Sequence, residues 1–346
     1  MSYGIFLVQY GLVNKGFWEK LSFPVVGLSP MDGVTDAACR FMAKKHGKSD
    51  VSYTEFVSAE GLWRINERGD REHRIWKELI FDETERPVIA QIFGSEPESF
   101  TKAAKIVGEM GFDGIDINMG CPSPGLEKRE GGAGLMRNKE RAARVIEATR
   151  KGIKEAGRNI PVSVKTRLGS AEVDPSWWEF LATQKLAAVA MHGRTFKQLY
   201  SGKADWESLK KAGKVIKKSG ALFLANGDIS QIEMNGDETL AVLSDGEKIQ
   251  MKGWCDGVLI GRWAIGNPWV LRKDGYAPGK REKLEAVLEH ARKHEEFFGE
   301  KGFAAVRKHL AGYVKGMDDA TELRSRLVLA DNSANVEEII KNEAEM

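Results

Sequence analysis

The stretch GFDGIDINMGCPSP, residues 111–124, is the part of the chain from which the fold can be worked out. Residues 112–118 alternate apolar and acidic side chains as a short strand does, and the break at 120–122 presents a cysteine just past the strand's end. In a barrel of alternating strands and helices, catalytic side chains gather at the C-terminal ends of the strands. Asn118 and Cys121 are therefore the first candidates for chemistry. The alternative for Cys121 is a small buried side chain in the core.

Seven further apolar runs of strand length flank this stretch, and helical patterns fall between most of them. Buried parallel strands are typically continuous apolar runs, and parallel strands need helical crossovers. The pattern therefore predicts a (β/α)8 TIM barrel. The runs are VVGLSP (25–30), DVSYTEF (50–56), RPVIAQIFG (86–94), PVSVKTRLG (161–169), LAAVAMHGRT (186–195), ALFLANGDI (221–229) and CDGVLIGR (255–262).

Three segments fall outside the barrel rhythm and set the predicted domain boundaries. Residues 1–23 form an N-terminal extension, whose apolar run 4–13 is predicted to be a strand or hairpin that plugs the bottom of the barrel. The barrel covers 24–275, and ETLAVLSDGEKIQMK (238–252) reads as a β-hairpin inserted into it. From 278 to 346 the pattern is amphipathic and helical, which predicts a separate C-terminal all-helical domain.

Composition narrows the class of protein. The chain has 346 residues, 42% hydrophobic and 29% charged, as ordinary globular proteins do, and no run is long enough to span a membrane. Cysteines 39, 121 and 255 show neither a metal-ligand spacing nor a disulfide framework. A net charge of +2 gives no overall case for nucleic acid. We therefore expect a cytoplasmic protein without a metal, and a monomer, although the sequence does not determine the oligomeric state.

Polar or small residues end most of the predicted strands, where an apolar core would not hold them. Because the carboxyl ends of parallel strands meet at one rim of a barrel, these side chains should converge there. In chain order they are Met31 and Asp32, Gln91, Asn118 and Cys121, Lys165 and Arg167, His192 and Arg194, Asn226 and Asp228, and Gly261 and Arg262.

The loops after the last two strands suit a phosphate group. Gly227 and Gly261 let the backbone approach it, and Arg262 can fork onto its oxygens. An inward-facing Lys165 would place positive charge beside a ring that becomes anionic on reduction, such as a flavin, and Gln91 has the donor and acceptor for a uracil-like edge. The alternative for Lys165 is an ion pair with Glu55 or Asp116.

Nine motifs in series, from residue 29 to 269, resemble those of the tRNA-dihydrouridine synthases. They are SPMDGVTD (29–36), YTEFVSAEGL (53–62), QIFGSEPE (91–98), DINMGCPSP (116–124), GGAGLMRN (131–138), SVKTRLG (163–169), MHGRTFKQLYSGKADW (191–206), LANGDI (224–229) and GVLIGRWAIGNPW (257–269). Two positions depart from the family pattern: Phe196 stands where a basic residue is common, and Trp263 where glycine is frequent.

The resemblance implies an FMN-binding barrel that uses NADPH to reduce the C5–C6 double bond of selected uridines in tRNA. Hydride would reach carbon six, Cys121 would give a proton to carbon five, and Asn118 would orient the uracil. The positions carried over as FMN-binding are Pro30, Met31, Asp32, Gln91, Lys165, His192, Asn226, Gly227, Asp228, Gly261 and Arg262.

The helical tail matches the family's RNA-binding domain, and the target base would have to leave the RNA stack to react. Candidate RNA contacts are Arg194, Arg292, Lys293, Arg307, Lys308 and Lys315. Residues 278–316 hold nine Lys and Arg against six Glu, a mixture that also fits a merely solvated helix face. Two other functions stay open: an FMN barrel acting on a free pyrimidine, as dihydroorotate dehydrogenases do, and a flavin-binding RNA chaperone.

Overall fold

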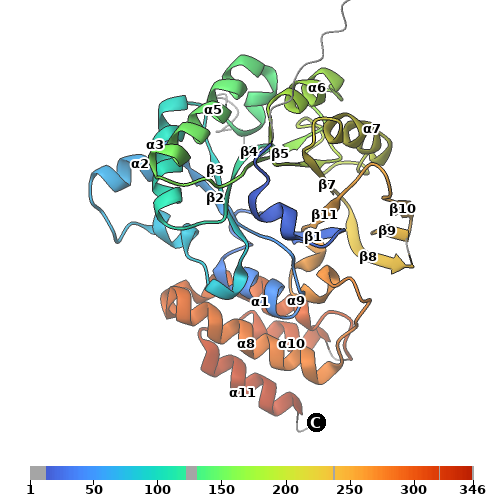
Figure 1. Ribbon diagram of the computed structural model, residues 1–346. Helices are drawn as coiled ribbons and strands as arrows, with labels where there is room; N and C mark the ends of the chain where they lie inside the picture. The colour runs from blue at the N-terminus through green and yellow to red at the C-terminus, as the bar shows by residue number, and fades with distance from the viewer. Residues whose placement is uncertain (1–12, 122–130, 237, 319, 345–346) are drawn as a thin grey trace, which may run out of the picture.

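The computed structural model describes residues 13–344 except 122–130, 237 and 319, and its centre is a closed parallel barrel (Figure 1). The strand order is β1-β11-β7-β6-β5-β4-β3-β2, and a parallel bridge between Gly27 and Val51 closes the ring. The predicted (β/α)8 fold is confirmed. The strands are β1 (Val25–Leu28), β2 (Ser52–Ser58), β3 (Val88–Phe93), β4 (Gly114–Met119), β5 (Val162–Arg167), β6 (Ala188–His192), β7 (Leu222–Asn226) and β11 (Gly257–Ile260).

Helices surround the barrel, and side-chain caps set where several of them begin. Asp36 caps the first of them by accepting a hydrogen bond from the backbone N–H of Cys39 at 2.8 Å. The helices around the barrel are α1 (Ala37–Lys45), α2 (Ala59–Glu67), α3 (Pro97–Glu109), α5 (Lys139–Glu155), α6 (Pro175–Thr183) and α7 (Trp206–Lys217). Short 3-10 helices include η1 (Gly16–Lys20), η2 (Arg74–Leu79), η3 (Glu83–Glu85), η4 (Gly132–Arg137), η5 (Arg262–Ala264) and η6 (Pro268–Leu271).

A tryptophan closes the N-terminal end of the barrel. Trp18 on η1 is only 1% exposed and packs with Val25, Ile89 and Leu222, which lie early in their strands. Figure 1 shows η1, in dark blue, across the middle of the barrel. A plug was predicted from the run 4–13, but residues 1–12 lie outside the described part of the chain. Because this end is filled by apolar side chains, polar chemistry is left to the opposite end.

The insertion before the last barrel strand is a three-stranded antiparallel sheet: β8 (Ile229–Asn235), β9 (Glu238–Leu243) and β10 (Lys248–Gln250). β9 and β10 form the hairpin expected at 238–252. The apolar run 221–229 predicts a single strand, so β8 is not expected from the sequence. The chain instead turns at Gly227 (φ +128°) and Asp228 (φ +56°), which ends β7 and starts β8. The N–H of Ser244 donates to the Asp228 carbonyl at 2.8 Å, so the insertion is anchored to that turn.

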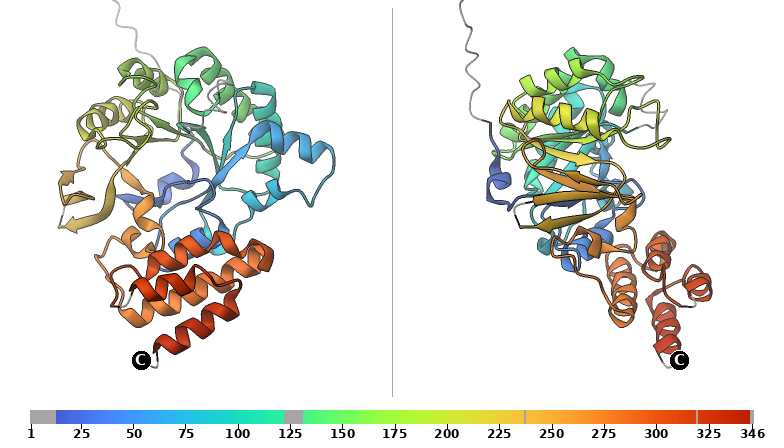
Figure 2. Two further views of the ribbon diagram at one scale, coloured as in Figure 1. Left: turned by 180° about the vertical axis from the view of Figure 1, so that it is seen from behind. Right: turned by 90° about the vertical axis from the view of Figure 1, so that its right-hand side faces the viewer.

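The C-terminal helices form a bundle against one side of the barrel (Figures 1 and 2). They are α8 (Lys280–Phe298), η7 (Glu300–Ala305), α9 (Arg307–Tyr313), α10 (Ala320–Leu327) and α11 (Ser333–Ala344). Their core includes Met42 and Trp269 from the barrel side, so the bundle and the barrel share apolar packing. Among the described residues, no helix has the length and apolar character needed to cross a bilayer.

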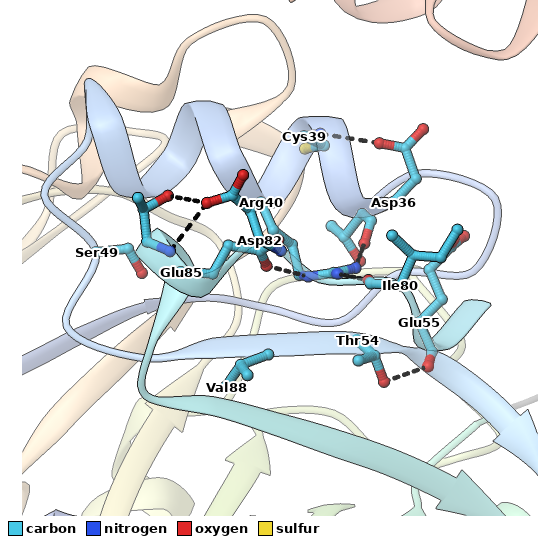
Figure 3. Close-up of polar contacts among 12 residues, drawn as sticks. Asp36, Cys39, Arg40, Ser49, Thr54, Glu55, Ile80, Asp82, Glu85 and Val88 are labelled. Atoms are coloured by element: carbon cyan, nitrogen blue, oxygen red, sulfur yellow. Dashed lines mark hydrogen bonds and ion pairs between the residues drawn. The ribbon is translucent and has the colours of Figure 1, made fainter. Parts of the chain in front are cut away.

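A buried ion pair fixes α1 and the segment before β3 (Figure 3). Arg40 Nε donates to Glu85 Oε2 at 2.7 Å, and both side chains are almost fully buried. The same guanidinium also donates to the backbone carbonyls of Thr35 and Ile80. Since the Arg40 side chain is only 1% exposed, removal of Glu85 would leave an uncompensated charge in the core.

Candidate active site

A cavity of about 700 Å³ opens at the C-terminal ends of the barrel strands. It brings together most of the predicted site residues: Pro30, Met31, Asp32, Asn118, Cys121, Lys165, His192, Asn226, Gly227, Asp228, Gly261 and Arg262. Its volume is within the range of about 300–1,000 Å³ that ligand sites occupy. Phe56, Phe93, Arg167, Tyr200 and Trp263 also line it.

Asn118 holds the backbone at Cys121. Its Oδ1 accepts hydrogen bonds from the N–H groups of Gly120, at 3.0 Å, and Cys121, at 2.8 Å. This is a turn that an asparagine side chain builds with the backbone two and three residues ahead. Cys121 is half-buried and lines the cavity. Asn118 therefore fixes the backbone that carries Cys121, a contact that the sequence did not predict. Its predicted contact with uracil stays a prediction.

Gln91 lies below the cavity rather than in its wall. It is fully buried, its Nε2 donates to Asp116 Oδ2 at 2.7 Å, and its Oε1 accepts from Asn118 Nδ2 at 3.0 Å. Asp116 also accepts from Ser163 Oγ at 2.6 Å. Gln91, Asp116 and Ser163 are register partners on β3, β4 and β5, so their side chains lie on the same face of the sheet, inside the barrel. In this arrangement Gln91 supports Asn118 from beneath, and its predicted contact with a flavin edge stays a prediction.

Lys165 supplies positive charge at the floor of the cavity. Its Nζ donates to Asn226 Oδ1 at 3.2 Å, while Asn226 Nδ2 donates to the Leu259 carbonyl at 2.7 Å. The alternative ion pair of Lys165 with Glu55 or Asp116 does not form. Burial, and next the nearby Arg167 charge, lower the pKa of Lys165 to about 8. The group is thus still mainly charged at neutral pH but titrates close to it.

The turn after β7 and the loop after β11 meet at one corner of the cavity. Asp228 accepts from Arg194 Nη2 at 2.8 Å and from Arg262 Nη2 at 3.2 Å. At Gly227, a Cβ would lie 2.8 Å from that of Ala204, so only glycine fits the turn. Arg262 is 56% exposed and keeps donors available, as the predicted phosphate contact requires.

Buried cations make this corner electropositive. Burial, followed by the charge of Arg167, lowers the pKa of His192 well below its usual value, so the imidazole is neutral. Its Nε2 therefore accepts from Arg194 Nη1 at 3.2 Å. The ring of Tyr200 lies between the guanidinium groups of Arg167, 5.9 Å from the ring centroid, and Arg262, 5.2 Å away. An anionic group would be the natural ligand of such a corner.

The six predicted RNA contacts lie in different surroundings in the structure. Arg194 is 2% exposed and bound to Asp228, a position that does not fit contact with RNA. Three of the others form ion pairs with nearby carboxylates. Arg292 pairs with Glu337, Lys293 with Asp82 and Glu296, and Arg307 with Asp331. Lys308 donates to the Gly33 carbonyl in the loop after β1, and Lys315 lies over the ring of Trp263. Only Lys308 and Lys315 thus approach the mouth of the cavity.

Sequence reasoning missed several aromatic residues of the site. Phe56 and Phe93 lie near the ends of β2 and β3, where the strand-end pattern could have found them. Tyr200 lies in the loop after β6, and no periodic pattern places it in the cavity. Phe196, noted as a departure from the family, packs partly buried against the barrel core. In the described part of the chain, no group of three or more His, Cys, Asp or Glu is arranged to hold a metal ion.

Comparison with known proteins agrees with the motifs. The family model described as "Dihydrouridine synthase (Dus)" matches residues 27–345. Among curated relatives, a probable tRNA-dihydrouridine synthase of Staphylococcus epidermidis is 31% identical, covering 95% of this chain and 96% of that protein. One of Staphylococcus aureus is 32% identical (96% and 98%), and probable tRNA-dihydrouridine synthase 2 of Bacillus subtilis is 30% identical (94% and 95%). The chain belongs to the dihydrouridine synthase family.

Proposed function

We propose that this chain is an FMN-dependent, NADPH-driven tRNA-dihydrouridine synthase acting on uridines of tRNA in the cytoplasm. The observation that carries the proposal is the position of Cys121, held by Asn118 at the wall of a cavity that the cation Lys165 also lines. Family membership and the names of the relatives support the same substrate.

The residues of the cavity fit FMN. Pro30 and Met31 offer an apolar wall for a planar ring, and Lys165 offers the charge that stabilises an anionic reduced ring. Gly227, Gly261 and Arg262 would hold the phosphate, because two glycines leave room for it and the guanidinium has exposed donors. When bound and reduced by NADPH, FMN supplies the hydride that reaches carbon six of the uracil.

The protein's own part of the chemistry is proton transfer and positioning. Cys121 Sγ would give a proton to carbon five of the uracil, and the thiolate left behind would recover one from solvent. Lys165 and Arg167 both lie close enough to Cys121 to act on its charge, and they would stabilise that thiolate. Asn118 would keep the Cys121 backbone in one place while the bond to hydrogen forms.

The substrate must bring its base to the bottom of this cavity. Extrusion of a nucleotide costs a few kcal/mol, which contacts elsewhere on the tRNA must offset. Lys308 contacts the loop after β1 and Lys315 lies over Trp263, next to segments that line the cavity, and both are candidates for phosphate contacts.

Turnover by the intact protein tests the proposal against the free-pyrimidine alternative. FMN-loaded protein is reduced with NADPH without oxygen and mixed with unmodified tRNA transcript, uridine or orotate. We expect only the tRNA to reoxidise the flavin and to gain dihydrouridine, measured by nucleoside mass spectrometry. Reoxidation by a free pyrimidine at a comparable rate would favour the alternative. A flavin that stays reduced with every substrate would refute a synthase and leave a binding protein.

A further inference from the structure

A second cavity, of about 630 Å³, adjoins the first. The two share Arg262, Trp263 and Ile265, so the segment after β11 forms the partition between them. The remaining wall comes from three distant parts of the chain: the turn of the inserted sheet at Ser244, α8 at Lys283, and the segment after α9 at Lys315. The cavity thus lies between the barrel, its insertion and the helical bundle.

The charged side chains that line this second cavity are all cationic. They are Arg262, Lys283 and Lys315, and no carboxylate lies among the lining residues of the described chain. Neither Lys283 nor Lys315 forms an ion pair with any described residue. Arg292 and Arg307 on the same bundle, by contrast, are neutralised by neighbouring carboxylates. Arg262 pairs with Asp228 on the side of the first cavity, so Lys283 and Lys315 are the two cations that favour an anionic ligand here.

An exposed indole lies at the partition. Trp263 is 42% exposed and lines both cavities, and Lys315 Nζ lies 5.6 Å from its ring centroid. Large exposed aromatic rings beside lysines are the elements with which proteins bind single-stranded nucleic acid, by stacking on bases and pairing with phosphates. Trp263 is also one of the two positions that depart from the family pattern.

The backbone between barrel and bundle is packed tightly enough to keep the cavity's shape. A Cβ on Gly266 would lie 2.4 Å from the His309 carbonyl oxygen, and one on Gly312 would lie 2.6 Å from that of Ile265. Only glycine at both positions allows the two segments to touch. The cations of the bundle are therefore held at a fixed place relative to the active site.

We propose that the second cavity binds the nucleotide next to the target uridine, with its base on Trp263 and its phosphate between Lys283 and Lys315. The inference rests on the proposed function, since only a polynucleotide substrate places a second nucleotide beside the first. It assigns a role to the insertion, whose turn at Ser244 forms the outer wall. It also identifies Trp263 as a residue that selects an unstacked strand over a free pyrimidine.

Salt dependence of tRNA binding tests the phosphate contacts. The Kd for tRNA is measured between 50 and 300 mM NaCl, a range within which such contacts weaken strongly, for the FMN-loaded wild type and for Lys283→Ala and Lys315→Ala. Each lost contact should lower the slope of log Kd against log salt by about 0.7–1. Lys218→Ala is the matched control, because Lys218 is exposed at the end of α7 that faces the N-terminal side of the barrel. Slopes unchanged in both variants, or lowered equally in the control, would overturn the proposal.

Stacking is tested on Trp263. Trp263→Ala should raise the Kd for tRNA about tenfold and Trp263→Phe much less, because phenylalanine keeps a ring face. Flavin content shows whether the partition still holds its shape. Slower reduction of the flavin by NADPH in the lysine variants, with tRNA binding intact, would reassign the cavity to the dinucleotide and refute the proposal. Failure of the wild type to form dihydrouridine would instead refute the proposed function itself.

Discussion

Replacement of Asn118 by alanine should slow catalysis without emptying the barrel. Asn118 Oδ1 accepts two backbone hydrogen bonds, from Gly120 and Cys121, and these fix the turn that carries the thiol. A hydrogen bond contributes about 0.5–1.5 kcal/mol net, so the two together favour this turn by about 1–3 kcal/mol. Loss of this stabilisation lowers the fraction of molecules in which the turn holds Cys121 in place. If the rate of proton transfer follows that fraction, it falls about 5- to 150-fold.

The assay is a single turnover at saturating tRNA. Protein with reduced flavin is mixed with tRNA without oxygen, and the return of flavin absorbance gives the rate of the chemical step. Asn118→Asp is the comparison, since it keeps an acceptor oxygen for the two backbone N–H groups while it replaces the donor to Gln91 Oε1 by a carboxylate oxygen. We expect it to lose less than the alanine variant. An alanine variant as fast as the wild type would show that this turn does not position the thiol.

Three further predictions concern charge and stability. Because burial lowers the pKa of Lys165 to about 8, its charge is lost as pH rises through 8. The affinity of the apoprotein for FMN, measured by flavin fluorescence, should therefore fall about tenfold between pH 7 and 9. In the Lys165→Met variant the affinity should not change with pH over this range. Arg262→Ala should weaken FMN retention only about fivefold, since the guanidinium is half-exposed, and unchanged flavin content on dialysis would contradict its phosphate role. Glu85→Ala should lower the free energy of unfolding in urea by about 3–5 kcal/mol, because it leaves the buried Arg40 without its partner. Glu60→Ala, which breaks an exposed pair with Arg64, should lower it by less than about 1 kcal/mol. Equal losses in the two variants would refute the argument.

Much of the fold could be predicted from the sequence because barrel strands carry a local pattern. Each strand is a short apolar run, and its polar end residue marks the rim, so residues as distant as Met31 and Arg262 could be assigned to one cavity. The start of β8 could not be predicted, because it depends on two positive-φ residues, Gly227 and Asp228. They lie within an apolar run whose pattern is that of a single strand.

The functions of individual polar residues were harder to predict than their positions. Gln91 and Asn118 both lie at strand ends, yet one is buried beneath the cavity and the other lines it, because a strand's register decides how far along the barrel axis a side chain lies. Arg194 looks like an exposed cation in the sequence, but Asp228 binds it inside. Such pairings join segments far apart in the chain, and a single sequence carries no local signal for them.

The most direct measurement is dihydrouridine formation by Cys121→Ala protein that has been shown to retain its flavin. The account predicts normal reduction of the flavin by NADPH, followed by reoxidation by tRNA and dihydrouridine formation at least about 100-fold slower than in the wild type, because the acid that protonates carbon five is missing. A single-turnover rate equal to that of the wild type would contradict it.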